Sequence, residues 1–299
     1  MPNDFNAPVI DEFRANNGRV GGWFEGARLL LLTTTGVRSG LRHTTPLGYL
    51  PDGGDRILVI ASAGGAPRHP AWYHNLVANP IVTVEDGIFT YEAKATVLTG
   101  EERDRVFARA VEDNPGWAEY QAKTTRALPV VALAAIPGPP RTNATSMGGA
   151  LKLIHDAFRR ELALIRAEVA KSGPMLGAQL RVNCLTLCRG LHGHHTKEDT
   201  AMFVGVGHQR PDLAPVLDRL RAEHEAIAVL LAHLQHVLGD AVLDRSTLQA
   251  EVDRLTTELE LHLDYEEEEL IPVLDGTTHR RPSTVGPGLT GPGPTTSAD

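Results

Sequence analysis

The second half of the sequence contains four long runs of residues with apolar side chains at helical spacing. The runs span residues 148–173, 174–207, 210–240 and 244–276, and Pro or Gly stands near every junction. Apolar residues three and four positions apart give each helix one apolar stripe. Because the connections are short, consecutive helices are expected to run antiparallel. The pattern predicts an up-down-up-down four-helix bundle over residues 150–276.

Histidine and glutamate occur on these helices at a spacing suited to metal ligands. His194 and Glu198 lie four positions apart in the second run, as do His262 and Glu266 in the fourth, and these are the only HxxxE pairs in the sequence. Residues four apart share one helix face. The first and third runs each contribute a histidine, His155 and His224. Four imidazoles and two carboxylates form a donor set suited to two iron ions bridged by carboxylates, whereas a structural zinc site takes four ligands.

Other interpretations of these residues stay open. A single HxxxE pair is usually a solvated ion pair, although two pairs on different helices argue against that interpretation. A register shifted by one residue gives His195 and Asp199 as a rival pair. His195 is rotated about 100° from His194, and His192 about 200°, so both are expected at the surface or outside the ligand set. Glu267 is a candidate acceptor for an imidazole N–H.

The spacing over about residues 150–275 resembles the hemerythrin-like, or HHE cation-binding, family. The resemblance implies a non-haem di-iron centre in which the two glutamates bridge the metal ions. It assigns the ligands to His155, His194, Glu198, His224, His262 and Glu266. Oxygen-carrying hemerythrins have a further histidine at the position of Ala228. The resemblance therefore favours members linked to nitric oxide, oxygen or peroxide chemistry, or to iron-sulfur cluster repair.

The first half of the sequence contains short apolar or β-branched runs separated by turn residues. The six expected strands cover residues 28–36, 43–50, 56–62, 81–87, 91–98 and 128–136. Helical patterns interrupt them only at residues 9–16, 70–79 and 101–114. A parallel sheet needs a helix after nearly every strand, so the pattern favours an antiparallel, barrel-like sheet.

Two glycine-containing segments of this half are candidate anion sites. Residues 33–47, "TTTGVRSGLRHTTPL", combine hydroxyl groups with Arg38 and Arg42, and residues 61–80 place a glycine loop before a helix that follows Pro70. Exposed backbone N–H groups and a helix N-terminus both favour anions. The alternative is a hairpin turn that needs glycine only for its geometry.

Together with "FRANNGRVGG" and "EYQAKTTRALPVVAL", these segments resemble the deazaflavin-dependent nitroreductase family over about residues 4–137. The resemblance implies a split β-barrel of the FMN-binding type that binds coenzyme F(420), with flavin mononucleotide as the alternative cofactor. It implies hydride transfer to a quinone, nitro compound or similar electron acceptor. The implied cofactor-binding residues are Thr35, Arg38, Ser39, Arg42, Pro46, Ser62, Gly64, Gly65, Ala66, Trp72 and Asn75.

Three positions qualify this resemblance. Tyr120 aligns with an aromatic region on the substrate side, where a phenol could donate a proton, and its alternative role is packing. Val37 stands where a basic residue is common in the family, and Ala63 where lysine is frequent. Both departures weaken the attraction for an anionic cofactor.

Composition narrows the class of protein and its partners. A formal net charge of −8 without a basic cluster argues against nucleic acid. Without a long apolar run or a signal peptide, we expect a cytoplasmic protein whose N-terminal helix packs on the barrel rather than on a membrane. Cys184 and Cys188 are expected to be small core residues. Residues 138–149 are expected to be a linker, and residues 277–299 a disordered tail.

Three functions from different classes follow. The first is an F(420)-dependent enzyme whose di-iron bundle senses or binds dioxygen, nitric oxide or iron. The second is a bifunctional enzyme in which the di-iron site itself reduces dioxygen, nitric oxide or peroxide, although hydride transfer to one-electron iron needs an intermediary. The third is a metal-free bundle that serves as an interaction domain. We rank them in that order, and a homodimer is compatible with a split barrel.

Overall fold

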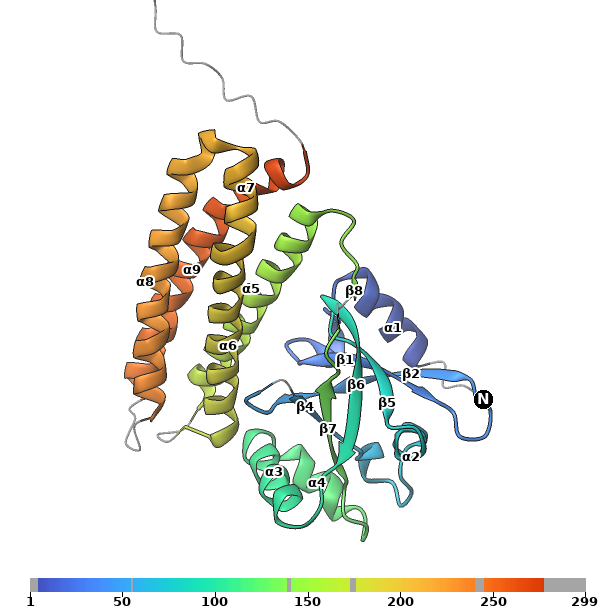
Figure 1. Ribbon diagram of the computed structural model, residues 1–299. Helices are drawn as coiled ribbons and strands as arrows, with labels where there is room; N and C mark the ends of the chain where they lie inside the picture. Colours follow the sequence, from blue (N-terminus) through green and yellow to red (C-terminus); the bar gives the residue numbers. More distant parts are fainter. Residues whose placement is uncertain (1–4, 55, 139–140, 173–175, 240–244, 277–299) are drawn as a thin grey trace, which may run out of the picture.

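The computed structural model describes residues 5–54, 56–138, 141–172, 176–239 and 245–276. A β-sheet with short helices forms the first part of the chain, and a group of long helices lies beside it (Figure 1). We call these parts the barrel and the bundle. The predicted tail at 277–299 lies outside the described residues.

The sheet of the barrel is antiparallel throughout, as predicted. Its spatial order is β2-β1-β5-β6-β7-β4-β3. The strands are β1 (Leu29–Thr35), β2 (Arg42–Gly48), β3 (Leu50–Pro51), β4 (Arg56–Ile60), β5 (Ile81–Glu85), β6 (Phe89–Val97) and β7 (Val130–Ala135). Only Tyr49 separates β2 from β3, and β2 also contacts β4. The two edges of the sheet therefore belong to one bent strand, which curves the sheet into a split barrel.

Each of the six predicted strand segments contains an observed strand. The segment at 43–50 divides into β2 and β3, because the chain bends at Tyr49 to reach the other edge of the sheet. The segment "LLLLTT" of β1 is buried along its length, which is typical of a strand covered on both faces. A further short strand, β8 (Arg141–Thr142), pairs with β6 inside the predicted linker.

Four helices accompany the sheet: α1 (Asn6–Ala15), α2 (Ala71–Ala78), α3 (Gly100–Asp113) and α4 (Gly116–Ala122). Val9 and Phe13 of α1 are buried against Leu29 and Leu31 of β1, so this helix packs on the barrel. The sequence analysis did not predict α4, whose seven residues are too few for a clear periodicity.

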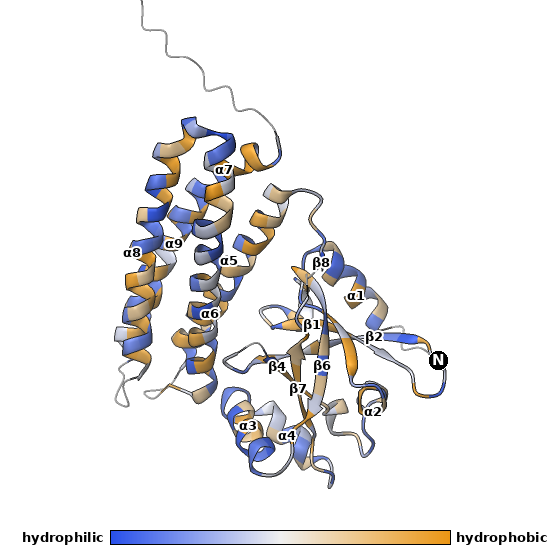
Figure 2. Ribbon diagram, viewed as in Figure 1, coloured by the Kyte–Doolittle hydropathy of each residue, from blue (hydrophilic) through white to orange (hydrophobic). Residues whose placement is uncertain are grey.

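The bundle consists of α5 (Met147–Lys171), α6 (Ala178–Lys197), α8 (Ala214–Gly239) and α9 (Arg245–Leu274). A π-helical turn, η3 (Glu198–Met202), and α7 (Phe203–Gln209) continue α6. Hydrophobic and hydrophilic segments alternate along these helices, as the amphipathic pattern predicts (Figure 2). Leucines from all four long helices fill the core, and they include Leu162, Leu187, Leu231 and Leu259.

The barrel contacts the bundle through α5 and α6. Arg28, whose side chain is 9% exposed, forms ion pairs with Glu161 and Glu168 of α5. The Gln179 side chain of α6 donates a hydrogen bond of 2.9 Å to the carbonyl of Pro51. These contacts hold α5 and α6 against the barrel. No helix of the described residues is long and apolar enough to cross a membrane.

Candidate metal centre and cofactor groove

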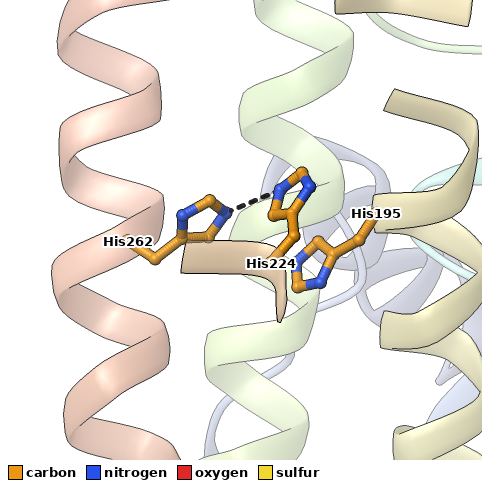
Figure 3. A group of neighbouring side chains, drawn as sticks. All are labelled: His195, His224 and His262. Atoms are coloured by element: carbon orange, nitrogen blue, oxygen red, sulfur yellow. Dashed lines mark hydrogen bonds between the residues drawn. The ribbon is translucent and has the colours of Figure 1, made fainter. Parts of the chain in front are cut away.

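Seven metal-ligating side chains meet in the middle of the bundle. They form two groups, and within each group one ligand atom per residue lies within 4.8 Å of the others. The first group is His155, His194, Glu198 and Glu266, and the second is His195, His224 and His262. Figure 3 shows the second group converging from three helices. The bundle thus brings together all six predicted ligands and one further histidine.

The two glutamates of the first group also face imidazoles of the second group. The Oε1 atom of Glu198 lies 3.0 Å from His194 Nε2, and its Oε2 atom lies 3.6 Å from His224 Nε2. The Oε2 atom of Glu266 lies 3.5 Å from His155 Nε2 and 3.6 Å from His262 Nε2. Each carboxylate therefore faces imidazoles of both groups, which is the position required of a bridging ligand.

Several of these atoms lack ordinary hydrogen-bond partners. Within the described residues, seven buried atoms of the two groups have no partner in hydrogen-bond geometry, and these include His194 Nε2 and Glu198 Oε1 despite their 3.0 Å separation. They are the Nε2 atoms of His155, His194 and His195 and both carboxylate oxygens of Glu198 and of Glu266. Burying polar atoms without partners is costly. Cations coordinated by these lone pairs would remove that cost, so the residues present fit a di-metal centre.

Burial shifts the pKa of these groups in the direction expected for a site without cations. The pKa values of the Glu198 and Glu266 carboxyl groups are raised, first by burial and then by neighbouring carboxylates. Burial lowers the pKa of His194 to about 3 and that of His262 to about 4. The imidazoles are therefore neutral near pH 7 and able to coordinate a metal ion.

Three carboxylates outside the two groups orient the imidazoles. Each carboxylate has an oxygen within hydrogen-bond distance of an imidazole Nδ1 atom. The distances are 3.0 Å for Glu267 and His155, 2.9 Å for Asp199 and His224, and 3.0 Å for Glu223 and His262. An Nδ1–H that donates to a carboxylate leaves the Nε2 lone pair free to face the site. The predicted role of Glu267 agrees with this contact, whereas Asp199 hydrogen-bonds to an imidazole instead of joining the ligand groups.

The expectation that His195 lies at the surface or outside the ligand set does not match the structure. His195 is buried, and its ring stacks on that of His224 with 4.1 Å between centroids, while His194 packs against Phe158 on α5. The interior stripe of a bundle helix is 100° or more wide, so two adjacent residues can both face inward. His192 is exposed, as expected. The contact of Glu223 with His262 was not predicted. The position of Glu223 next to the predicted ligand His224 could have indicated a role near the site.

In the barrel, a groove of about 990 Å³ lies between α1, α2 and the turn that joins β1 to β2. Of the predicted cofactor-binding residues, those that line the groove are Arg38, Ser39, Trp72 and Asn75. Asn75 is buried and fixes this region, since its amide donates to Thr34 Oγ1 at 3.1 Å and accepts from the Val37 backbone N–H at 3.2 Å.

Other predicted residues of this set lie elsewhere. Arg42 lines a separate polar pocket of about 860 Å³ and donates to Thr83 Oγ1 at 2.6 Å. Thr35 and Pro46 lie in β1 and β2 and, among the described residues, are not lining residues of the 990 Å³ groove. Thr44 lines both pockets, so the two hollows are neighbours on the barrel surface.

The remaining predicted residues lie on the turn η2 (Ala63–Gly65) and beside it, against α4: Ser62, Gly64, Gly65 and Ala66. Gly65 has φ +84°, and a Cβ there would lie 2.7 Å from the carbonyl oxygen of Tyr120. Arg126, which the sequence analysis did not single out, donates to the carbonyls of Ser62 and Ala66 at 2.6 and 2.9 Å. Its guanidinium fixes the turn.

Tyr120 lies on α4 and packs edge-on against Trp117, with 6.0 Å between ring centroids. Lys123 Nζ lies 5.1 Å from the centre of the Tyr120 ring. Among the described residues, Tyr120 is not a lining residue of the 990 Å³ groove. These contacts agree with its alternative role in packing and leave its predicted catalytic role untested.

Known proteins similar to this chain match both parts. The family model described as F(420)H(2)-dependent quinone reductase matches residues 8–135. An F(420)H(2)-dependent quinone reductase of Mycobacterium tuberculosis is 41% identical over 125 residues, which cover 40% of this chain and 83% of the relative. The chain belongs to this family. A second relative from that species, a putative F(420)H(2)-dependent quinone reductase, is 34% identical over 104 residues, or 35% of this chain and 87% of its own.

This F(420)H(2)-dependent quinone reductase family member carries a second match. The family model described as hemerythrin HHE cation binding domain matches residues 148–274, which contain all seven side chains of the two groups. The quinone reductase match ends before β8, and the hemerythrin match begins after it.

Solved structures resemble the barrel of this family member. One F(420)H(2)-dependent reductase is 43% identical, with a TM-score of 0.33, and the match covers 36% of this chain and 93% of that one. A second solved structure, described only as a domain-swapped dimer, is 39% identical, with a TM-score of 0.35, and the match covers 42% of this chain and 92% of that one.

Proposed function

We propose that the barrel is an F(420)-dependent oxidoreductase that transfers hydride from the reduced deazaflavin to a quinone, nitro compound or similar acceptor. We further propose that the bundle holds two non-haem iron ions and senses or binds dioxygen, nitric oxide or iron. Family membership supports the first part. The second part is supported by the seven buried nitrogen and oxygen atoms of the two groups that have no hydrogen-bond partner in the described structure.

For the barrel, the groove beside Trp72 is the candidate cofactor site. Arg38 and Ser39 on the β1–β2 turn provide a cation and a hydroxyl at its edge, and Trp72 provides an apolar wall. The cofactor supplies the hydride chemistry, whereas the protein orients it against the acceptor. Tyr120 remains the candidate proton donor. Flavin mononucleotide is the alternative occupant of this groove.

For the bundle, the donor set proposed for the metal ions comprises five imidazoles and two carboxylates. Imidazole and carboxylate ligands suit iron, which supplies reversible one-electron chemistry and binds small gas molecules. The two glutamates would bridge the ions, and Asp199, Glu223 and Glu267 would hold three of the imidazoles in the coordinating tautomer.

The arrangement of the two parts favours separate roles over a single bifunctional centre. The groove is lined by α2, the β1–β2 turn and the N-terminal part of α1. In Figure 1, α2 and β2 lie on the side of the barrel away from the bundle. Deazaflavin delivers hydride, whereas iron changes its charge by single electrons. We therefore rank a sensing or binding bundle above one that receives electrons directly from the barrel.

The decisive experiment combines metal analysis with an anaerobic titration. We expect about two irons per chain and charge-transfer bands in the visible spectrum of the aerobically purified protein. We expect these bands to persist when reduced F(420) is added, while F(420) oxidation with an added quinone proceeds. Bands that bleach on titration would favour the bifunctional enzyme. If the purified protein contains no iron, the remaining function for the bundle is that of a metal-free interaction domain.

We also propose that the protein forms a homodimer through its barrel. The support is the solved relative described as a domain-swapped dimer. Light scattering on the full chain should give about twice the mass of 32.3 kDa. A monomeric mass across the micromolar range would contradict the proposal.

A further inference from the structure

The candidate metal centre is closed to solvent. Of the seven side chains, His194 is the most exposed, at 10%, and His155 and Glu266 are fully buried. Side chains in protein interiors pack at the density of organic crystals. A small molecule that reaches these donor atoms must therefore pass between packed side chains at a definite place.

Phe158 of α5 packs against His194. The centroids of the two rings lie 5.2 Å apart, and Phe158 itself is only partly buried. Phe158 also lines a cleft of about 250 Å³ between the barrel and the bundle. The Phe158 ring therefore contacts both the cleft and the most exposed imidazole of the centre.

The cleft is lined mainly by apolar side chains from both parts of the protein. The barrel contributes Tyr49, Ile57 and Ile88, and the bundle contributes Ala157, Phe158 and Leu187. Arg56, Asp86, Arg160 and Glu161 provide the charged groups of the lining. Arg56, Arg160 and Glu161 already have partners within the protein, so the apolar side chains decide which molecules the cleft favours. They favour small neutral molecules, because an ion loses hydration against them.

Gly190 of α6 keeps space open beside Phe158. It lines the cleft, and a Cβ at this position would lie 3.4 Å from Phe158 Cε1. A larger side chain at position 190 would fill the cleft and restrict the motion of the Phe158 ring. Rotamer changes of such partly buried side chains open gaps wide enough for diatomic molecules, and larger acceptors would need the helices to separate.

We propose that this cleft is the access site for a small neutral gas molecule, dioxygen or nitric oxide, and that Phe158 is the gate between the cleft and the metal centre. The proposal rests on the proposed function of the bundle as a metal centre. It also gives the barrel a second role, because the barrel forms one wall of the cleft. The Arg28 ion pairs with Glu161 and Glu168 hold that wall in place.

The first test uses xenon as an apolar probe of the metal-free, full-length protein. We expect xenon pressure to shift the NMR signals of the Ile57, Ile88 and Leu187 methyl groups, and Gly190→Leu to abolish the shifts. The control is Gly205→Leu, also in a helix of the bundle, where no heavy atom of the described residues lies within 4 Å of a built Cβ. If the NMR signals of these methyl groups do not shift under xenon pressure in the unsubstituted protein, the proposal is overturned.

The second test measures the bimolecular rate of nitric oxide binding to the iron-loaded protein by stopped flow. We expect Gly190→Leu to slow binding at least about tenfold, which corresponds to about 1.4 kcal/mol in the barrier, and Phe158→Ala to accelerate it. Iron content should stay unchanged in both variants and in Gly205→Leu.

The outcomes separate the two proposals. Rates that are equal in all variants, with iron bound, would overturn the route and leave the metal centre intact. A protein that takes up no iron would overturn the metal centre, and with it the route, even where xenon still occupies the cleft.

Discussion

At the scale of single residues, the bundle uses its acidic side chains in two ways. Glu198 and Glu266 face the imidazole Nε2 atoms, whereas Asp199, Glu223 and Glu267 contact Nδ1 atoms from outside. Sequence spacing predicted the first two, because the HxxxE pattern places them on one helix face. It could not assign Glu223, because that contact joins α8 to α9 and depends on how the helices pack.

Glu267→Gln tests the outer contacts. The substitution removes the negative charge that His155 Nδ1 contacts at 3.0 Å, so we expect iron affinity to fall by about 10- to 100-fold. Competition with a chelator measures the affinity. Glu268→Gln alters the exposed neighbouring residue and should leave it unchanged. Equal affinities in the two variants would show that the outer carboxylate does not support the ligand.

The raised pKa values of Glu198 and Glu266 predict a pH dependence for the metal-free protein. Near pH 6.5 the unfolded histidines still bind protons that the folded histidines do not, which opposes the effect. About one pH unit higher the histidines are neutral in both states, and the two carboxyl groups bind more protons in the folded chain than in the unfolded chain. From there the free energy of unfolding should fall as pH rises through the folded pKa values of the two glutamates. Urea denaturation at several pH values measures this slope, and a rising stability would contradict it.

At the scale of elements, the helices and strands with a periodic sequence pattern could be predicted, and the elements without such a pattern could not. Four helices and six strands have clear periods, and the structure contains all of them in the described residues. The π-helical turn η3 has no sequence period of its own. β8 has two residues, and it pairs with Phe89 and Thr90 of β6, outside the segment of β6 that pairs with β7. The inward position of His195 was missed because one helix face was assumed to be narrower than it is.

Insertion of one alanine after Met202 tests the register that the π-helical turn sets. One further residue at the start of the α-helix that follows would rotate Phe203 by about 100° and move it out of the core. Phe203 is fully buried and stacks on His224 at 5.4 Å, so we expect a loss of about 3–5 kcal/mol in the free energy of unfolding. Thr200→Ala keeps the chain length and serves as the control. An insertion variant as stable as this control would show that the register set by the turn is not needed.

At the scale of the whole molecule, buried polar contacts join the barrel to the bundle. We expect Arg28→Met to lower the free energy of unfolding by about 2 kcal/mol, because it leaves Glu161 and Glu168 without their cation while both remain partly exposed. Denaturation followed by tryptophan fluorescence and circular dichroism measures the loss, and all three tryptophans lie in the barrel. Arg14→Met breaks an exposed pair with Glu85 and should cost under about 1 kcal/mol.

Iron removal tests whether the two parts work independently. Because the cofactor groove lies away from the bundle, we expect the chelated protein to oxidise reduced F(420) within about twofold of the loaded protein's rate. A stopped assay with an added quinone measures this rate. A larger loss would show that the metal centre acts on the reductase through the shared interface.

The seven buried nitrogen and oxygen atoms without hydrogen-bond partners also affect the lifetime of the protein in a cell. A ligand that binds only the folded chain stabilises it by mass action. Proteases act on the transiently unfolded fraction, which grows when that ligand is scarce. Pulse-chase turnover should therefore be faster in iron-starved cells, so that the supply of one metal sets the abundance of a reductase whose own cofactor contains none.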